Sequence, residues 1–284
     1  MALYYQSGSN RIVGFVRYVF PDTPAEKAGL KRGDVITHFN GFEINTNNYT
    51  IMFGSTSKTT FTVLDQYWEN PRQVEITPAY ITKDPVLYHN IYQGEGYNGR
   101  KVGYLFYTNF TENYNESLHD VFSEFKSAGI TDLVLDLRYN PGGGITAATY
   151  LASLIAPVDV VDKKSVFTIL SYNSYVNGIF DKEKWDRKDY LGDYNTKYPN
   201  PLTANINSGN LKLYIIATGN SASASELLAF CLKPYMDVDV ELIGEKTHGK
   251  YTASWTLHPY NDYDGKVQPI YKESSLSSKK KKEL

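Results

Sequence analysis

The sequence holds one cysteine, Cys231, and no long apolar run. A single thiol excludes an internal disulfide framework and a zinc site built from cysteines. Because Cys231 lies in an apolar stretch of helical character, we predict a buried structural thiol rather than a nucleophile. No apolar run reaches membrane-spanning length, and no signal peptide opens the chain. We therefore expect no membrane-spanning segment, and either a cytoplasmic protein or one whose export signal is missing from this sequence.

An excess of charge of one sign is also missing. The 29 basic and 31 acidic side chains give a net charge of −2, which implies no general attraction to nucleic acid or to a membrane surface. No feature of the sequence indicates a metal or an organic cofactor. Tyrosine, by contrast, is abundant, with 25 residues, and it suits β-rich surfaces and peptide-binding grooves. The 284 residues, 42% of them hydrophobic, are globular in composition and sufficient for two domains.

Residues 1–85 have the pattern of a small β-rich domain with short helices. Thr23 is a suitable helix N-cap, Pro24 suits the first helical position, and Gly29 follows the expected helix end. Asn40-Gly41 predicts a hairpin turn. Runs of apolar and β-branched residues predict the strands of this domain, which are 13–20, 35–39, 59–64 and 73–76.

The same segment carries a motif that is fixed at many positions between Thr23 and Gly41. The motif consists of Thr23-Pro24-Ala25, Ala28-Gly29-Leu30, Gly33-Asp34, Ile36 and Asn40-Gly41. It closely resembles the PDZ domain of bacterial proteases. The resemblance implies recognition of a chain end by adding an extended peptide to a sheet edge. A purely structural β-module is the alternative.

Glycines and Pro85 break residues 82–99, so we place a domain boundary near residue 86. Strand and helix patterns then alternate, which predicts a βα core with a largely buried sheet over 86–272 and an α/β (α+β overall) fold class. Residues 171–210 are polar and aromatic, and we expect a long excursion over the active-site face with a short helix around 181–188. Residues 273–284 have the composition of a disordered basic tail. The predicted strands are 101–107, 133–137, 213–217 and 241–244, and the predicted helices are 116–127 and 145–154.

The segment Ser221-Ala222-Ser223-Ala224-Ser225-Glu226 lies between an apolar strand-like run and an apolar helix-like run. A serine in such a turn can hold its hydroxyl clear of the backbone, next to N–H groups at a helix N-terminus, where negative charge is favoured. That is a suitable place for a nucleophile and part of an oxyanion hole. The alternative is a helix cap in which Ser223 and Glu226 form a capping box.

A serine hydroxyl needs a base to take its proton. The five histidines are scattered, and none is paired with an aspartate in a recognisable pattern. Lysine is the established alternative, provided that burial or a nearby positive charge lowers its pKa. Lys250 follows an apolar strand and a glycine turn, so it is our candidate for the base.

The glycine run in Asn140-Pro141-Gly142-Gly143-Gly144 can supply the remaining requirement. Acyl transfer needs N–H donors aimed at the developing oxyanion, and glycines allow close approach of backbone to substrate. Gly142 or Gly143 would give one donor, and Ala224 the second. A tight turn with no further role is the alternative for the glycine run taken alone.

Together these pieces resemble the C-terminal processing, or tail-specific, serine proteases, in which a PDZ domain precedes a ClpP/crotonase-like catalytic core. The matching motifs occur in the family's order. The resemblance implies a Ser223 nucleophile, a Lys250 base and oxyanion donors from Ala224 and from Gly142 or Gly143. It also implies cleavage of protein or peptide substrates near a free C-terminus, and a place in the cell envelope, periplasm or another extracytoplasmic compartment. The motifs are 135–143, 221–226 and 244–250.

Two departures from the family pattern stand out. Many members have a glutamine four residues after the lysine, where this chain has Ser254, so the group that orients the lysine differs or is weaker. Members also commonly continue well past the position at which this sequence turns into its lysine-rich tail. These departures motivate an alternative function as a non-catalytic peptide-binding scaffold. A crotonase-like acyl-CoA enzyme is a third possibility, which the PDZ motif and the serine motif both disfavour.

Overall fold

The computed structural model describes the chain except for residues 237–239, 251, 253–259, 264–265 and 270–284. Met1–Gly249 form one compact unit and Lys250–Leu284 form a second. The described elements of the second unit are strands β14 (Tyr260–Tyr263) and β15 (Lys266–Pro269), which pair antiparallel. Ser254 and the predicted tail 273–284 lie outside the described residues.

The N-terminal part of the first unit is an antiparallel sheet with strand order β1-β2-β3-β5-β6, in which β4 pairs with β3. The β3–β4 turn is Asn40-Gly41, and both residues have positive φ, as predicted for a tight hairpin. Thr23 caps α1 by accepting a hydrogen bond from the Glu26 N–H. One expectation was wrong in extent, because the strand expected over 13–20 ends at Phe15. The elements are β1 (Ala2–Tyr5), β2 (Ile12–Phe15), α1 (Pro24–Lys27), β3 (Val35–Phe39), β4 (Phe42–Glu43), α2 (Tyr49–Gly54), β5 (Thr59–Leu64) and β6 (Arg72–Ile76).

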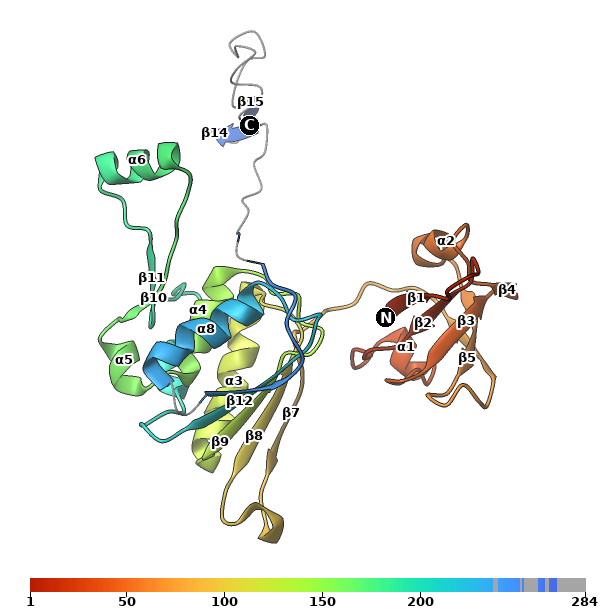
Figure 1. Ribbon diagram of the computed structural model, residues 1–284, viewed down its shortest axis with the longest axis horizontal. Coiled ribbons are helices and arrows are strands. Elements are labelled where there is room, and N and C mark those ends of the chain that lie inside the picture. The colour runs from red at the N-terminus through yellow and green to blue at the C-terminus, as the bar shows by residue number, and fades with distance from the viewer. Residues whose placement is uncertain (237–239, 251, 253–259, 264–265, 270–284) are drawn as a thin grey trace. The chain divides into compact units, whose positions relative to one another are not determined.

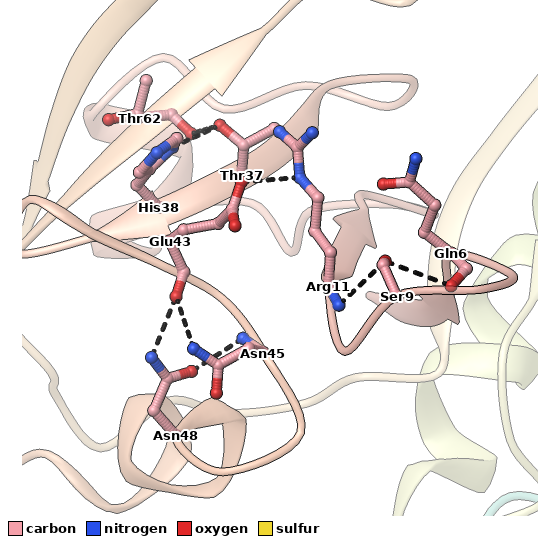
Figure 2. Close-up of polar contacts among 9 residues, drawn as sticks. All are labelled: Gln6, Ser9, Arg11, Thr37, His38, Glu43, Asn45, Asn48 and Thr62. Carbon is pink, nitrogen blue, oxygen red and sulfur yellow. Dashed lines mark hydrogen bonds and ion pairs between the residues drawn. The ribbon is translucent and has the colours of Figure 1, made fainter.

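Polar contacts tie the turn after β1 to the loop that leads into α2 (Figure 2). The Glu43 carbonyl accepts hydrogen bonds from the side-chain amides of Asn45 and Asn48. The Glu43 carboxylate lies 2.9 Å from Arg11 Nε, and the Ser9 hydroxyl accepts a hydrogen bond from the Arg11 N–H. The Arg11–Glu43 pair joins segments that are more than thirty positions apart in the sequence.

The second sheet has strand order β13-β12-β9-β8-β7. Strands β8, β9, β12 and β13 are parallel, and β7 is antiparallel to β8. The helices α3, α4 and α8 lie together on one side of this sheet (Figure 1), and their apolar side chains form the larger core with it. The elements are β7 (Val86–Tyr92), η1 (Glu95–Tyr97), β8 (Val102–Tyr107), η2 (Glu112–Tyr114), α3 (Asn115–Ala128), β9 (Asp132–Asp136), α4 (Ile145–Ile155), α5 (Val158–Asp162), β12 (Lys212–Ala217), α8 (Ala224–Met236) and β13 (Val240–Gly244).

The helix predicted over 116–127 is α3. It is amphipathic, and the apolar side chains of its inner face are all buried, namely Leu118, Val121, Phe122 and Phe125. The parallel register places Ile216 of β12 between Asp136 of β9 and Ile243 of β13. The three strands therefore end at the same edge of the sheet, which is where open α/β sheets place their ligand sites.

The excursion between α5 and β12 is more ordered than its composition indicates. Strands β10 (Val166–Ile169) and β11 (Lys188–Tyr190) pair antiparallel, and α6 (Ser174–Glu183) lies at the end of this ribbon (Figure 1). The helix expected around 181–188 is thus placed too late. Asn173 starts it by accepting a hydrogen bond from the Val176 N–H, and Lys184 ends it in the left-handed region. A further short helix, α7 (Pro201–Ala204), starts at the Asn200 cap.

Candidate active site

Three loops meet at the shared edge of the second sheet. The loop after β9 carries the glycine run, the loop after β12 carries the three serines, and the loop after β13 leads to Lys250. The Ala222 N–H donates to the Asn140 carbonyl, at 3.1 Å, and the His248 N–H donates to the Ser221 carbonyl, at 2.9 Å. The serine turn is therefore hydrogen-bonded to both of its neighbours.

Ser223 is the last residue before α8, and its φ is +57°. A non-glycine residue in the left-handed region costs about 1–3 kcal/mol, and such residues cluster at functional sites. The strand–turn–helix arrangement, with a strained serine at the turn, is the geometry of a nucleophile elbow. Ser223 is half-buried, and its hydroxyl makes no hydrogen bond within the part of the chain that the structure describes.

The other two serines of the motif have structural partners. The Ser221 hydroxyl donates to the Leu137 carbonyl at 2.8 Å and accepts from the Thr218 N–H at 3.0 Å. The Ser225 hydroxyl donates to the Asn140 carbonyl at 3.0 Å. Both side chains are buried, with 0% and 3% of their surface exposed. Of the three serines, Ser223 alone combines partial exposure with a hydroxyl that is not engaged in this way.

The glycine turn packs directly against the serine turn. Gly142 has φ +100°, and a Cβ added there would lie 2.8 Å from both Ser223 Cβ and Ala224 N. Gly143 has φ +145°, and a Cβ there would lie 2.2 Å from the Phe110 carbonyl oxygen. Both positions require glycine because any side chain would collide with backbone or with the serine itself.

Asn140 is the residue that organises this turn, and our sequence analysis did not assign it a role. Its side-chain oxygen accepts from the Gly142 N–H at 2.9 Å, and its amide donates to the Tyr107 carbonyl at 2.9 Å. The side chain is completely buried. An asparagine two residues before a glycine is a signature of an Asx turn, which is the signal that predicts this contact.

Some backbone N–H groups of the glycine turn and the serine turn have a hydrogen-bond acceptor, and others do not. The Gly142 N–H is bound to Asn140, and the Gly144 N–H is bound to the Phe110 carbonyl at 2.9 Å. The N–H groups of Gly143 and Ala224 have no acceptor in the described part of the chain. Of the two glycines expected as donors, Gly143 is therefore the one whose N–H is available.

A buried ion pair fixes the start of the glycine loop. The Asp136 carboxylate, at the end of β9, has no exposed surface, and its two oxygens share the Nε–H of Arg138, at 3.0 and 2.9 Å. The carboxylate also accepts hydrogen bonds from the backbone N–H of Arg138 and from the Tyr104 hydroxyl, the latter at 2.6 Å. Burial, and then the bond to Asp136, raise the pKa of Tyr104 to about 12, while Asp136 raises the pKa of Arg138. Tyr104 and Arg138 therefore keep their protons near neutral pH.

The glycine loop also contacts the N-terminal sheet region. Tyr139, with φ +66°, lies beneath the Arg17 guanidinium, which is 5.0 Å from the ring centre. The Arg32 guanidinium lies 5.9 Å from the same ring. Arg17 also donates to the Asn220 side chain, in the loop after β12, at 3.0 Å. No local pattern in the sequence predicts these contacts, because they join residues more than a hundred positions apart.

Glu226 makes half of the expected capping box. Its carboxylate accepts from the Ser223 N–H at 2.7 Å, whereas the Ser223 hydroxyl does not return a bond to the helix. The carboxylate also binds the loop after β13, through Thr247 and the Gly249 N–H. Gly249 is the last residue of the first unit, and Lys250 is the first residue of the second. The Lys250 side chain is exposed.

Comparison with known proteins identifies the family. The profile described as Peptidase family S41 matches residues 101–274, which contain all three loops, and a PDZ-domain profile matches residues 15–49. The chain belongs to peptidase family S41. The recognition of a PDZ module followed by an S41 protease fold is thereby confirmed.

Named relatives of this S41 chain are carboxyl-terminal processing proteases. It is 27% identical over 237 residues to the carboxyl-terminal-processing protease of a Picosynechococcus strain. This match covers 81% of this chain and 49% of that protein. It is 27% identical over 244 residues to the carboxy-terminal processing protease CtpA of Bacillus subtilis, covering 84% of this chain and 45% of that protein. The chain thus spans about half the length of these curated relatives.

Among solved structures, the fold is similar to that of a protein described as an S41 protease from Bacteroides fragilis. The TM-score is 0.70 and the sequence identity 28%, over 91% of this chain and 66% of that one.

Two remaining expectations concern the single thiol and membrane-spanning segments. Cys231, expected to be buried, is only partly so, and this burial raises the pKa of its thiol. A raised pKa disfavours the reactive thiolate, which agrees with a structural role. In the part of the chain that the structure describes, no helix is long and apolar enough to cross a membrane.

Proposed function

We propose that this chain is a serine endopeptidase in which Ser223 is the nucleophile and Lys250 is the general base. The observation that carries the proposal is the contrast among the three serines. Ser221 and Ser225 are buried with bonded hydroxyls, whereas Ser223 sits in a strained turn at the N-terminus of α8. Membership of the S41 family supports the reaction class.

In the proposed reaction the Ser223 hydroxyl attacks the carbonyl carbon of a peptide bond while Lys250 Nζ takes its proton. The tetrahedral intermediate then collapses, the C–N bond breaks, and the lysine ammonium returns the proton to the leaving amine. The same lysine then takes a proton from water, which attacks the acyl-enzyme ester. The bond between the acyl carbon and Ser223 Oγ breaks, the lysine ammonium returns the proton to Oγ, and the acid leaves. The proposed reaction requires Lys250 to be an uncharged amine when Ser223 attacks.

We further propose that the N–H groups of Gly143 and Ala224 bind the oxyanion. Both lack an acceptor among the described residues, and Gly142 holds the two turns against each other. Ala224 is the first residue of α8, where the helix dipole also favours negative charge. Gly142, whose N–H is bound to Asn140, acts as a spacer and not as a donor.

We propose protein substrates with a free C-terminus, engaged in part by the PDZ region. The PDZ profile match and the names of the relatives support this assignment. An extended peptide would pair with an exposed strand edge of the PDZ region and place its terminal carboxylate at one end of that edge. We also propose the expected extracytoplasmic location, which cell fractionation tests.

The decisive experiment compares three alanine variants on an unfolded protein substrate with an apolar C-terminus. Ser223→Ala and Lys250→Ala are expected to abolish cleavage. Ser225→Ala is the matched control, because it removes an identical hydroxyl two residues away and should retain activity. Undiminished cleavage by Ser223→Ala would contradict the proposal. Tight peptide binding by the wild type, without cleavage and without labelling by a serine-reactive probe, would instead support the scaffold alternative.

A further inference from the structure

Among residues 1–249, the carboxylate of Glu226 accepts hydrogen bonds from two separate segments. Its Oε2 accepts from the Ser223 N–H at 2.7 Å. Its Oε1 accepts from the Thr247 hydroxyl at 2.6 Å and from the Gly249 N–H at 2.8 Å. Ser223 follows β12, while Thr247 and Gly249 follow β13. One half-buried side chain therefore joins the serine turn to the loop that precedes Lys250.

Helix capping accounts for the first of these bonds and not for the other two. A capping box needs only the contact between Glu226 and the Ser223 N–H. The bonds to Thr247 and Gly249 hold a loop that is otherwise tied to the serine turn by the His248 N–H, which donates to the Ser221 carbonyl. Gly249 is covalently joined to Lys250, so fixing Gly249 restricts where the base can lie.

We propose that Glu226 is a positioning residue for the reaction: its carboxylate sets the spacing between the Ser223 turn and the Thr247–Gly249 segment, and thereby presents Lys250 to the nucleophile. The inference rests on the proposed Ser223–Lys250 mechanism. It requires a carboxylate, because three donors converge on it. A glutamine in its place would turn an N–H₂ group toward at least one of those donors.

The test measures the rate at which a fluorophosphonate probe labels Ser223, together with kcat and KM for a peptide substrate. Glu226→Gln is expected to slow labelling on the order of 100-fold, as misplacement of catalytic groups by about 1 Å does. The kcat should fall in parallel while KM stays unchanged, because no substrate contact is removed. Glu241→Gln, an exposed substitution on β13, is the matched control and should behave as wild type.

Thr247 provides a second pair of variants that leaves Glu226 in place. Thr247→Val removes one charge-assisted bond and should slow labelling about tenfold. Thr247→Ser keeps the hydroxyl and should restore most of the rate. Thermal unfolding midpoints measured on all variants show whether each remains folded at the assay temperature.

Wild-type labelling rates in Glu226→Gln would overturn the inference, as would equal rates in Thr247→Val and Thr247→Ser. The inference would also be overturned if the loss of labelling in each variant were no larger than its unfolded fraction. Glu226 would then stabilise the fold without positioning Lys250. In all three cases the wild type is labelled and Ser223→Ala is not, so the proposed function survives. Failure of the wild type to label at Ser223 would overturn the proposed function, and this inference with it.

Discussion

Hydrogen bonds from neighbouring groups hold the backbone conformations of Ser223, Gly142 and Asn140. Ser223 occupies the left-handed region because its N–H is held by Glu226 and its carbonyl accepts from the Glu226 and Leu227 N–H groups. Asn140 bonds the Gly142 N–H with its side chain and the serine turn with its carbonyl. The strain at Ser223 is thus sustained by a set of hydrogen bonds that also fix the neighbouring turn.

At this scale we predict that Gly142→Ala abolishes most activity. The new Cβ would lie within 2.8 Å of the Ala222 carbonyl, Ala224 N and Ser223 Cβ, at φ +100°, so the two turns must separate. We expect kcat/KM to fall about 100-fold, measured on a peptide substrate. Gly144→Ala is the matched control: its Cβ would find no atom closer than 3.6 Å. Similar activity in both variants would argue against close packing of the two turns as a requirement.

Strands β9, β12 and β13 matter for the site through their parallel register, which brings three loops to one edge. The buried Asp136–Arg138 pair then fixes the direction in which the loop after β9 leaves the sheet. Removing one partner of a buried pair is costly because the other charge loses its compensation.

We accordingly predict that Asp136→Asn lowers the free energy of unfolding by about 3 kcal/mol and also lowers activity at temperatures where it is folded. Denaturant unfolding and substrate cleavage measure the two effects. The comparison variant is Asp159→Asn, whose partner Lys163 is also exposed; an exposed pair of this kind contributes under about 1 kcal/mol. Equal effects of the two substitutions would remove the structural role we give to Asp136.

Much of this arrangement could be predicted from local sequence. The α3 face, the Asn40-Gly41 hairpin and the Thr23 cap depend on residues within a few positions of one another, and each was found where expected. The contacts of Asn140, the three bonds of Glu226 and the start of α6 were not. Long-range hydrogen bonds leave no periodic signal, and in a polar segment the Asn173 cap competes with many other possible starts.

At the scale of the whole molecule, a PDZ-profile match at residues 15–49 precedes an S41-profile match at residues 101–274. The first sheet ends with β6 at Ile76 and the second begins with β7 at Val86, yet residues 1–249 form one compact unit. The domain limits of 85 and 272 stay predictions. The contacts of Arg17 and Arg32 with Tyr139 contribute to this compactness.

For the intact chain we predict a preference for substrates that end in a free carboxylate. The same peptide with an amidated C-terminus should show a KM about tenfold higher, because the loss of a charged hydrogen-bond acceptor costs about 1.5 kcal/mol or more. Its kcat should change little, since the scissile bond is untouched. Steady-state kinetics on the peptide pair measure both constants. An identical KM for the two peptides would mean that the chain end is not recognised.

The sequence by itself determined the residue types and their order: a PDZ motif, a glycine run, three serines before a glutamate, and a lysine after a strand. It also determined the elements that flank them, since apolar periodicity and caps act over a few residues. Only the tertiary structure decided among near-equivalent candidates. Within the described residues, it bonded the hydroxyls of Ser221 and Ser225 but not that of Ser223, and it left the Gly143 N–H without an acceptor. It also joined Glu226 to Thr247 and Gly249. These choices depend on which strands become neighbours, and the order of strands in a sheet is a property of the packed chain rather than of any one segment.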